Sequence, residues 1–423
     1  MTKTVKPRIA ILHYAGPPVV GGVEGTIYQH VRLFIQAGYQ VEVIAGRGEI
    51  THPSASFHQI LEIDSRNEEV TAVGEQLAEG QVTSRFFSLR DNLRERLKPL
   101  LAAADVTIVH NALTLHKNLP LTAALRCLLD EGITFWIAWC HDFAWQDPLY
   151  TPELHAGYPW NLLKKPWPGV CYVTVSDSRR ESLAILLGLP VEEIKVIPPG
   201  VDVARFFKLE PLTVHLMERL ALLESGPIFL LPARITRRKN IEFAIRVVAA
   251  VRPDLPEASL IITGPPGPHN PKNIAYLSAL KELAVELKVD QQVHFLYELG
   301  EKGRPLFIPD EVVADLYQLA DILLFPSRRE GFGIPVLEAA LARLPVIAAD
   351  IPPIRESADG LFIAFDPDGD PQKTGKSIRS LLDSDQTYQL RRRVLQNYSW
   401  KSILNKQLIP LIEKPRQHEY KEN

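Results

Sequence analysis

The sequence has few cysteines, no long apolar run and almost no net charge, and each shortage excludes a class of protein. Its three cysteines in 423 residues are an odd, sparse set without metal-site spacing, which indicates a reducing cytoplasm. No apolar run approaches the ~20 residues that span a bilayer. The amino-terminal segment leads straight into a strand and lacks the apolar core of a signal peptide. A net charge of −3 argues against bulk binding of nucleic acid.

What remains is typical of a folded, soluble protein: 46% of the residues are hydrophobic and 23% are charged. The length suits two domains. Apolar strand-like runs alternate with amphipathic helices along the chain, which predicts α/β, doubly wound sheets. We expect an N-terminal domain over 1–207, a C-terminal domain over 208–395, a linker near 203–212, and a terminal helix over 396–423 that crosses back to the N-terminal domain. Ligands are expected in a cleft between the two halves.

One stretch, Arg329 to Asp350, has the pattern of a glycine turn, a helix opened by Pro335 and a strand. Glycines before a helix leave backbone N–H groups free for an anion. Two carboxylates, Glu330 and Glu338, flank this turn. Carboxylates repel phosphate but accept hydrogen bonds from hydroxyls. The stretch therefore predicts a ligand with both phosphate and hydroxyl-rich parts, such as a nucleotide sugar.

A second candidate site is the basic segment Arg234 to Lys239, which lies between the predicted strand 227–234 and the predicted helix 240–251. Its four cations, three arginines and a lysine, are suited to phosphate, since Arg offers a planar fork and Lys a point charge. The alternative is a surface loop that happens to be basic.

Polar residues also follow strands in the first half of the chain. Gly21 and Gly22 follow the first strand, and His110 and His141-Asp142 end two later strands. Open α/β sheets bind ligands at this carboxyl edge. The alternatives are a tight turn for the glycines and ordinary hydrogen-bonded roles for the histidines.

Two further segments have two readings each. A predicted helix over 85–102 carries five cations that either touch anionic lipid heads or form a solvated face balanced by Asp91 and Glu95; the cations are Arg85, Arg90, Arg94, Arg96 and Lys98. The aromatic segment 143–169, which includes Trp145, either stacks on sugar rings or forms a local core.

Taken together, these motifs resemble those of the retaining, nucleotide-sugar-dependent GT-B glycosyltransferases of family GT4. The strongest element is the E-x7-E stretch from Glu330 to Glu338, within PSRREGFGIPVLEAALARLPVIA. Further matches are Gly21-Gly22, VSDSRRESLAILLG, KVIPPGVD and the Arg234/Lys239 pair. The sequence departs from the family where Pro265-Pro266-Gly267 replaces the usual acidic-glycine pair after Gly264.

The resemblance implies residue roles. His141, Arg234, Lys239 and Glu330 are the expected catalytic residues. The diphosphate would be held by Arg234 and Lys239, the donor sugar by Glu330 and the ribose by Glu338. The other expected donor-binding residues are Gly21, Gly22, Gly264, Phe295, Leu296, Gly331, Phe332, Gly333 and Ile334. The expected acceptor-binding residues are Glu24, His110, Asp142 and Trp145.

The implied reaction transfers a hexose from a nucleoside-diphosphate sugar, GDP-mannose or UDP-glucose, to an acceptor hydroxyl with retention. The leaving phosphate would take the acceptor's proton, and no cofactor or metal is expected. The acceptor would be a small molecule or a lipid-linked group, and the enzyme would work in the cytoplasm with contact at the inner membrane face. Two alternatives remain open: a nucleotide-sugar epimerase of GT-B fold, and a non-catalytic nucleotide-sugar-binding protein. The sequence does not specify the donor, the acceptor, the linkage or the oligomeric state.

Overall fold

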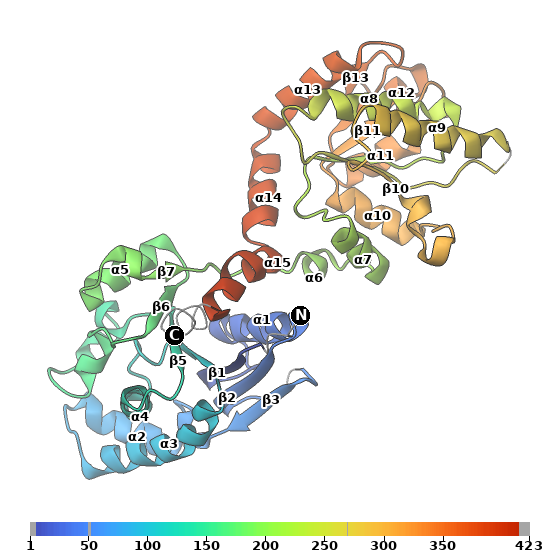
Figure 1. The fold of residues 1–423 in the computed structure, drawn as a ribbon. Helices are drawn as coiled ribbons and strands as arrows, with labels where there is room; N and C mark the ends of the chain where they lie inside the picture. Colours follow the sequence, from blue (N-terminus) through green and yellow to red (C-terminus); the bar gives the residue numbers. More distant parts are fainter. Residues whose placement is uncertain (1–5, 50–51, 269, 414–423) are drawn as a thin grey trace, which may run out of the picture. The chain divides into compact units, whose positions relative to one another are not determined.

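The computed structural model describes residues 6–49, 52–268 and 270–413, which form two compact units (Figure 1). Unit 1 contains the chain up to Gly200 and again from Trp400, and unit 2 runs from Val201 to Ser399. The segment 203–212, expected as a linker, instead contributes the helix α6 (Val203–Phe207) and the start of α7 (Pro211–Arg219) to unit 2.

Unit 1 is built on a sheet of seven parallel strands in the order β3-β2-β1-β4-β5-β6-β7. Strand β1 pairs with β2 on one side and β4 on the other, with Ile11 opposite Val43 and Ile108. The strands are β1 (Arg8–Ala15), β2 (Gln40–Arg47), β3 (Ala55–Gln59), β4 (Val106–His110), β5 (Phe135–Cys140), β6 (Cys171–Thr174) and β7 (Lys195–Val196).

Helices cover both faces of this sheet. Because successive residues of a strand point to opposite faces, alternate residues of β1 belong to different cores. Ala10 and Leu12 face a core formed with α2, α3, α4 and α5, whereas Ile9 and Ile11 face a second core. The helices are α1 (Gly22–Gln36), α2 (Glu68–Ala78), α3 (Ser84–Ala102), α4 (Leu119–Asp130) and α5 (Asp177–Leu187). The short 3-10 helices are η1 (Leu61–Ile63), η2 (Ala144–Gln146), η3 (Thr151–Glu153), η4 (Trp160–Leu163) and η5 (Val191–Glu193).

The second core of unit 1 is closed by α1 together with the C-terminal segment of the chain. This segment begins with α15 (Trp400–Ile403), passes through the π-helical residues Leu404–Leu408 (η9) and lies beside α1 (Figure 1). Trp400 packs so closely that a Cβ on Gly200 would lie 2.6 Å from its ring, which explains the glycine at the unit boundary.

Unit 2 has six parallel strands in the order β10-β9-β8-β11-β12-β13. This order, in which the first strand lies between the second and the fourth, is that of the dinucleotide-binding Rossmann sheet. The strands are β8 (Ile228–Leu231), β9 (Ser259–Ile262), β10 (Val293–Phe295), β11 (Ile322–Phe325), β12 (Val346–Ala349) and β13 (Ile363–Phe365).

Two cores again cover the two faces, with Ile228 and Leu230 in one and Phe229 and Leu231 in the other. The remaining helices are α8 (Ile241–Val251), α9 (Lys272–Glu286), α10 (Asp310–Leu319), α11 (Ile334–Leu341), α12 (Pro352–Ala358), α13 (Pro371–Ser384) and α14 (Gln386–Asn397), with short helices η6 (Arg237–Lys239), η7 (Leu296–Leu299) and η8 (Glu301–Gly303). The predicted α/β class and its two Rossmann-like, doubly wound sheets are confirmed. Among the described helices, none combines the length and the apolar character that crossing a membrane requires.

Candidate functional site

The basic segment and the glycine turn of unit 2, both predicted from the sequence, follow neighbouring strands. The segment 234–239 comes after β8, and the turn around Glu330 comes after β11, which pairs with β8. These two strands enclose the point where the strand order reverses, the usual ligand position in such sheets. The backbone N–H of Arg328 donates to the carbonyl of Arg238 at 2.9 Å and joins the two loops.

Lys239 and Glu330 form a buried ion pair at this position. Lys239 Nζ lies 2.5 Å from Glu330 Oε1, and each side chain is only 9% exposed. Arg238 Nη1 reaches the second carboxylate oxygen at 3.3 Å. Burial lowers the pKa of Lys239, and the Glu330 carboxylate opposes this shift. Glu330 therefore holds two cations together in a partly desolvated place, where charges act strongly on a ligand.

Arg234, the other predicted phosphate ligand, is exposed, and no described carboxylate pairs with it. Its guanidinium is therefore available to an incoming anion. Arg237 is occupied differently, because its guanidinium lies over the Tyr276 ring at 4.9 Å. Within the basic segment, Glu330 therefore pairs with Arg238 and Lys239, whereas Arg234 stays available to a ligand.

The glycine turn has a strict conformational requirement at Gly333. This residue has φ of +96° at the N-cap of α11, a region that favours glycine. A Cβ there would also lie 2.7 Å from Ile354. Gly331, Phe332 and Ile334 are exposed around the turn. Within α11, Pro335 has no N–H and the Val336 N–H donates to the Gly333 carbonyl at 2.9 Å. The anion site expected at this helix start would therefore use the N–H groups of the turn, and it stays a prediction.

Glu338, one turn inside α11, has a partner that sequence reasoning missed. Tyr317 on α10 donates its hydroxyl to Glu338 Oε2 at 2.6 Å. Burial and the neighbouring Glu338 carboxylate together raise the pKa of Tyr317, so its hydroxyl stays protonated and orients the carboxylate. The pairing depends on how two helices pack, and no local sequence pattern signals it.

Three predicted donor-binding residues have packing roles in unit 2. Phe295 and Leu296 are buried, at 6% and 0% exposure, and each belongs to one of the two cores of unit 2. A Cβ on Gly264 would collide with the carbonyl of Ala233, so this glycine is required by the close approach of two loops.

In unit 1, His110 and His141 meet at the ends of the paired strands β4 and β5. His110 Nδ1 lies 3.1 Å from His141 Nε2, with the rings stacked at 5.4 Å between centroids. His110 is completely buried and its side chain contacts His141, so its predicted contact with an acceptor stays a prediction. His141 remains partly exposed.

Asn111 fixes the backbone of the His141-Asp142 pair. It adopts φ of +59°, a left-handed conformation that Asn tolerates better than most residues. Its Oδ1 accepts hydrogen bonds from the backbone N–H groups of His141, at 2.8 Å, and Asp142, at 3.3 Å. Asp142 stays exposed, with Arg179 3.6 Å away.

Two more histidines, His13 and His30, pack against His110. Burial, aided by neighbouring histidines, lowers the pKa of His30 to about 3 and that of His141 to about 4, and brings the pKa of His110 well below its usual value. At neutral pH these rings are therefore uncharged.

The other unit 1 residues predicted to bind a ligand differ in how closely neighbouring side chains pack around them. Gly22 begins α1 with open space around its Cα, whereas a Cβ on Gly21 would collide with the Glu24 carboxylate. Trp145 donates its indole N–H to the Trp160 carbonyl at 3.1 Å and packs against the unit 1 core. This contact favours the local-core reading of the aromatic segment at Trp145.

The basic helix is confirmed as α3, and most of its cations are neutralised within unit 1. The ion pairs are Arg90 with Asp91, Arg94 and Lys98 with Glu131, and Arg96 with Glu62. These pairs favour the solvated-face reading, and contact with a membrane stays a prediction.

Two glycosyltransferase family models match the chain, one in each half. A family model described as "Glycosyltransferase Family 4" matches residues 20–205, and one described as "Glycosyl transferases group 1" matches residues 215–399. A D-inositol 3-phosphate glycosyltransferase from Corynebacterium urealyticum is 33% identical over 231 residues, 52% of this chain and 50% of that protein. A mannosylglucosylglycerate synthase from Petrotoga mobilis is 28% identical over 268 residues, 59% of this chain and 60% of that protein.

The chain thus spans between half and three fifths of the length of these curated relatives. A solved sucrose-phosphate synthase from Thermosynechococcus elongatus aligns over 99% of this chain and 100% of its own, at 16% identity and a TM-score of 0.37, too low to transfer any property.

Proposed function

The chain belongs to the glycosyltransferases of family 4, with two Rossmann-like units of the GT-B type, and on this premise we propose that it transfers a hexose from a nucleoside-diphosphate sugar to an acceptor hydroxyl with retention. The proposal is carried by one observation, the buried contact of Glu330 with Lys239 and Arg238 beside the amino end of α11. Cations for a diphosphate and a carboxylate for sugar hydroxyls occur there in one place.

In the proposed reaction, the bond between the sugar's anomeric carbon and the diphosphate oxygen breaks, and negative charge develops on the diphosphate. Lys239, Arg234 and the N–H groups of the glycine turn stabilise this charge, an electrostatic contribution prepared before the reaction begins. A leaving phosphate oxygen takes the proton of the acceptor hydroxyl as that hydroxyl attacks the same face of the sugar. These cations also serve where other enzymes use a metal ion, so we expect activity to survive chelation.

Glu330 has two functions in this proposal. Without donor it neutralises Lys239 and Arg238, and with donor it accepts hydrogen bonds from sugar hydroxyls while the cations turn to phosphate. Glu338, oriented by Tyr317, accepts from the ribose hydroxyls. GDP-mannose and UDP-glucose are the two proposed donors.

We assign the acceptor to unit 1, where His141 and Asp142 are held at the strand ends by Asn111. One relative is named for inositol 3-phosphate and the other for mannosylglucosylglycerate, and in line with these names we propose a hydroxyl-rich acceptor. A small molecule and a lipid-linked sugar both meet this description.

The test is to incubate the purified chain with UDP-glucose and GDP-mannose separately and to measure the nucleoside diphosphate released, with water as a slow acceptor. One donor should be cleaved, and NMR of the first product should show the retained anomer. Lys239→Met should lower the rate by about a hundredfold or more, the scale of losing one preorganised charge contact.

The matched control is Lys376→Met, an exposed lysine on α13 of the same unit, which should leave the rate unchanged. Near-wild-type cleavage by Lys239→Met would disprove the assigned role. Release of no nucleotide from either donor would favour a binding protein, and formation of a C2 epimer would favour an epimerase.

A further inference from the structure

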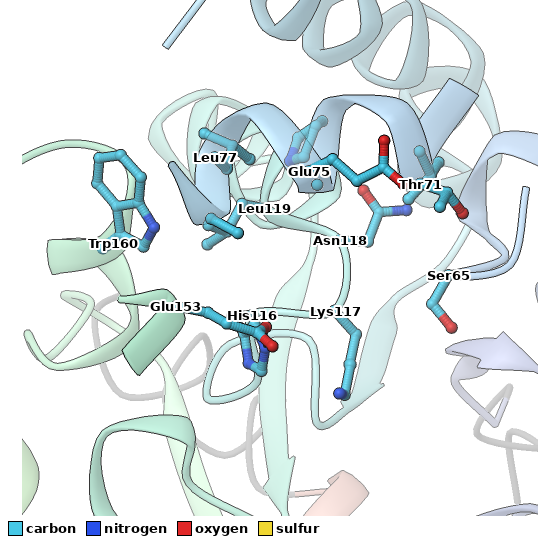
Figure 2. A pocket seen from close by; sticks show the side chains of 14 residues that line it. Ser65, Thr71, Glu75, Leu77, His116, Lys117, Asn118, Leu119, Glu153 and Trp160 are labelled. Carbon is cyan, nitrogen blue, oxygen red and sulfur yellow. The ribbon is translucent and has the colours of Figure 1, made fainter. Parts of the chain in front are cut away.

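Unit 1 has a cavity of about 260 Å³ between α2 and the short helices η3 and η4, and Figure 2 shows the side chains that line it. Three of its polar side chains are engaged by neighbours. His116 Nε2 lies 2.8 Å from the Glu153 carboxylate, Lys117 lies over the Tyr150 ring at 4.1 Å, and Asn118 caps α4. Because these contacts are made within unit 1, they do not indicate a ligand. A feature with direct connections to the candidate site lies in unit 2.

This feature is the 366–370 loop, which joins β13 to α13. Two of its three carboxylates bond within the loop or to the helix that follows. Asp366 Oδ1 accepts from the backbone N–H of Asp368 at 2.9 Å, and Asp370 Oδ1 accepts from that of Gln372 at 2.9 Å and caps α13. The loop is therefore braced internally and attached to a helix, so it can support other segments.

The first segment that it supports is the end of the basic segment. Asn240 directly follows Lys239, is only 1% exposed and donates its side-chain N–H to the Pro367 carbonyl at 2.9 Å. Although Asn240 begins α8, its side chain makes no capping bond to that helix. The contact is reinforced one turn into α8, where the Phe243 ring stacks on Phe365 at the end of β13, with centroids 4.8 Å apart.

The second segment is the start of the glycine turn. Arg328, two residues before Glu330, donates to Asp368 Oδ1 from Nη2 at 2.7 Å and from Nε at 3.1 Å. The Arg328 backbone N–H also holds the Arg238 carbonyl. The ion pair is exposed and contributes little to stability by itself. Its importance is that one loop contacts both halves of the candidate site.

These contacts matter most when the donor is bound. In the proposed reaction, Lys239 turns from Glu330 to the diphosphate, and the side-chain link between the basic segment and the glycine turn is broken. The backbone bond from Arg328 to Arg238 and the contacts of the 366–370 loop remain. A misplacement of reacting groups by about 1 Å can cost roughly a hundredfold in rate, so the spacing that these contacts preserve affects turnover.

We propose that the 366–370 loop is a positioning element of the donor site and that Asn240 and Asp368 are positioning residues. They keep Lys239 and Glu330 at a fixed spacing while both side chains turn to the donor, and they touch no substrate themselves. This inference rests on the proposed function, because it concerns donor cleavage by these groups.

The test measures kcat and KM of the full chain for whichever of UDP-glucose and GDP-mannose it cleaves, from the nucleoside diphosphate released. Asn240→Gly removes the amide and keeps the backbone, because glycine adopts the φ of +51° at this position without strain. We expect kcat to fall by about tenfold or more. KM should change by less than about threefold, since every group that contacts the donor is still present.

The matched control is Asn67→Gly, which removes an asparagine side chain that caps α2 in unit 1 and should leave kcat and KM unchanged. A second pair of variants disturbs exposed ion pairs and should fold. Asp368→Ala breaks the contact with Arg328 and should lower kcat by about threefold, whereas Asp383→Ala breaks an exposed pair with Arg379 on α13 and should leave kcat unchanged.

Wild-type kcat in Asn240→Gly or in Asp368→Ala, or an effect confined to KM, would overturn the positioning role and leave the proposed function standing. A loss of kcat in Asn67→Gly or Asp383→Ala as large as in the loop variants would assign the effect to lost stability and would also overturn the role. A wild type that cleaves neither donor would refute the proposed function and this inference with it.

Discussion

At the residue scale, the histidine pair of unit 1 shows how a buried neighbour determines what a functional group presents to a ligand. His110 Nδ1 and His141 Nε2 share one hydrogen bond, and His110 Nε2 is buried without a partner in the described part of the chain. If the proton were on Nε2, His110 would bury an unpaired N–H, which native structures avoid more strictly than an unpaired acceptor. The proton therefore belongs on Nδ1 of His110, which donates to His141.

We therefore expect His141 to carry its own proton on Nδ1 and to present an N–H donor, not a base. Long-range 1H–15N NMR with 15N-labelled histidine should show the Nδ1–H tautomer for His141 at pH 7. Because burial lowers its pKa to about 4, the neutral signal should persist as the pH falls past 6.5 and change only near 4. The unfolded chain takes up this proton near pH 6.5, so folding should lose stability over the same interval.

In His110→Phe the donor to His141 Nε2 is gone, and the tautomer populations of His141 should change. His52→Phe, a histidine outside this cluster, is the control and should change nothing. A wild-type spectrum with the proton on Nε2 would contradict the assignment.

Residue patterns bring the basic segment and the glycine turn of unit 2 to one edge of a sheet, because both follow strands of one parallel sheet whose carboxyl ends share an edge. They do not predict the side-chain contacts made there, such as the ion pair of Lys239 with Glu330. The burial of His110 and the Tyr317 partner of Glu338 are not foreseen, since each depends on which helix covers the side chain. Such contacts are tertiary and leave no periodicity in the sequence.

At the element scale, the strands are predictable because parallel strands buried on both faces are continuous apolar runs. The join between the units is harder. Pro198-Pro199-Gly200 predicts a turn, whereas the structure has an irregular segment there, and the polar residues beyond it form α6 and α7. Asp202 caps α6 by accepting from the Arg205 N–H at 3.1 Å, and Pro211 begins α7, where its missing N–H costs nothing.

The C-terminal segment closes a core of unit 1, although it is separated from the rest of that unit by the whole of unit 2 in the sequence. Ile403 is completely buried there, so Ile403→Ala should destabilise unit 1 by about 2–5 kcal/mol through lost burial and the cavity left behind. All six tryptophans lie in unit 1, so the denaturation midpoint measured by tryptophan fluorescence reports on this unit alone.

The control is Asn405→Ala, an exposed position two residues further on, which should change stability by less than about 0.5 kcal/mol. If the two substitutions shifted the fluorescence transition equally, the C-terminal segment would not be part of the unit 1 core in solution.

At the scale of the whole molecule, the proposed function divides its two substrates between the two units. The cations and the glycine turn proposed for the donor belong to residues 201–399, and the strand-end group proposed for the acceptor belongs to residues 6–200. A ligand stabilises the unit to which it binds, in proportion to its saturation. The division therefore has a thermodynamic consequence that can be measured without knowing the acceptor.

Hydrogen exchange of the full chain should show this division when UDP or GDP is added. At a concentration of 100 Kd, the bound nucleotide should stabilise unit 2 by about 2.7 kcal/mol, and protection should rise most in segments 234–239 and 330–338. Segment 106–142 of unit 1 should exchange as before, because no diphosphate ligand is assigned there. Lys239→Met at the same nucleotide concentration should lose most of the added protection, since the buried cation that meets the diphosphate is gone. Protection that rose equally in both units, or only in segment 106–142, would contradict the assignment of the donor to unit 2.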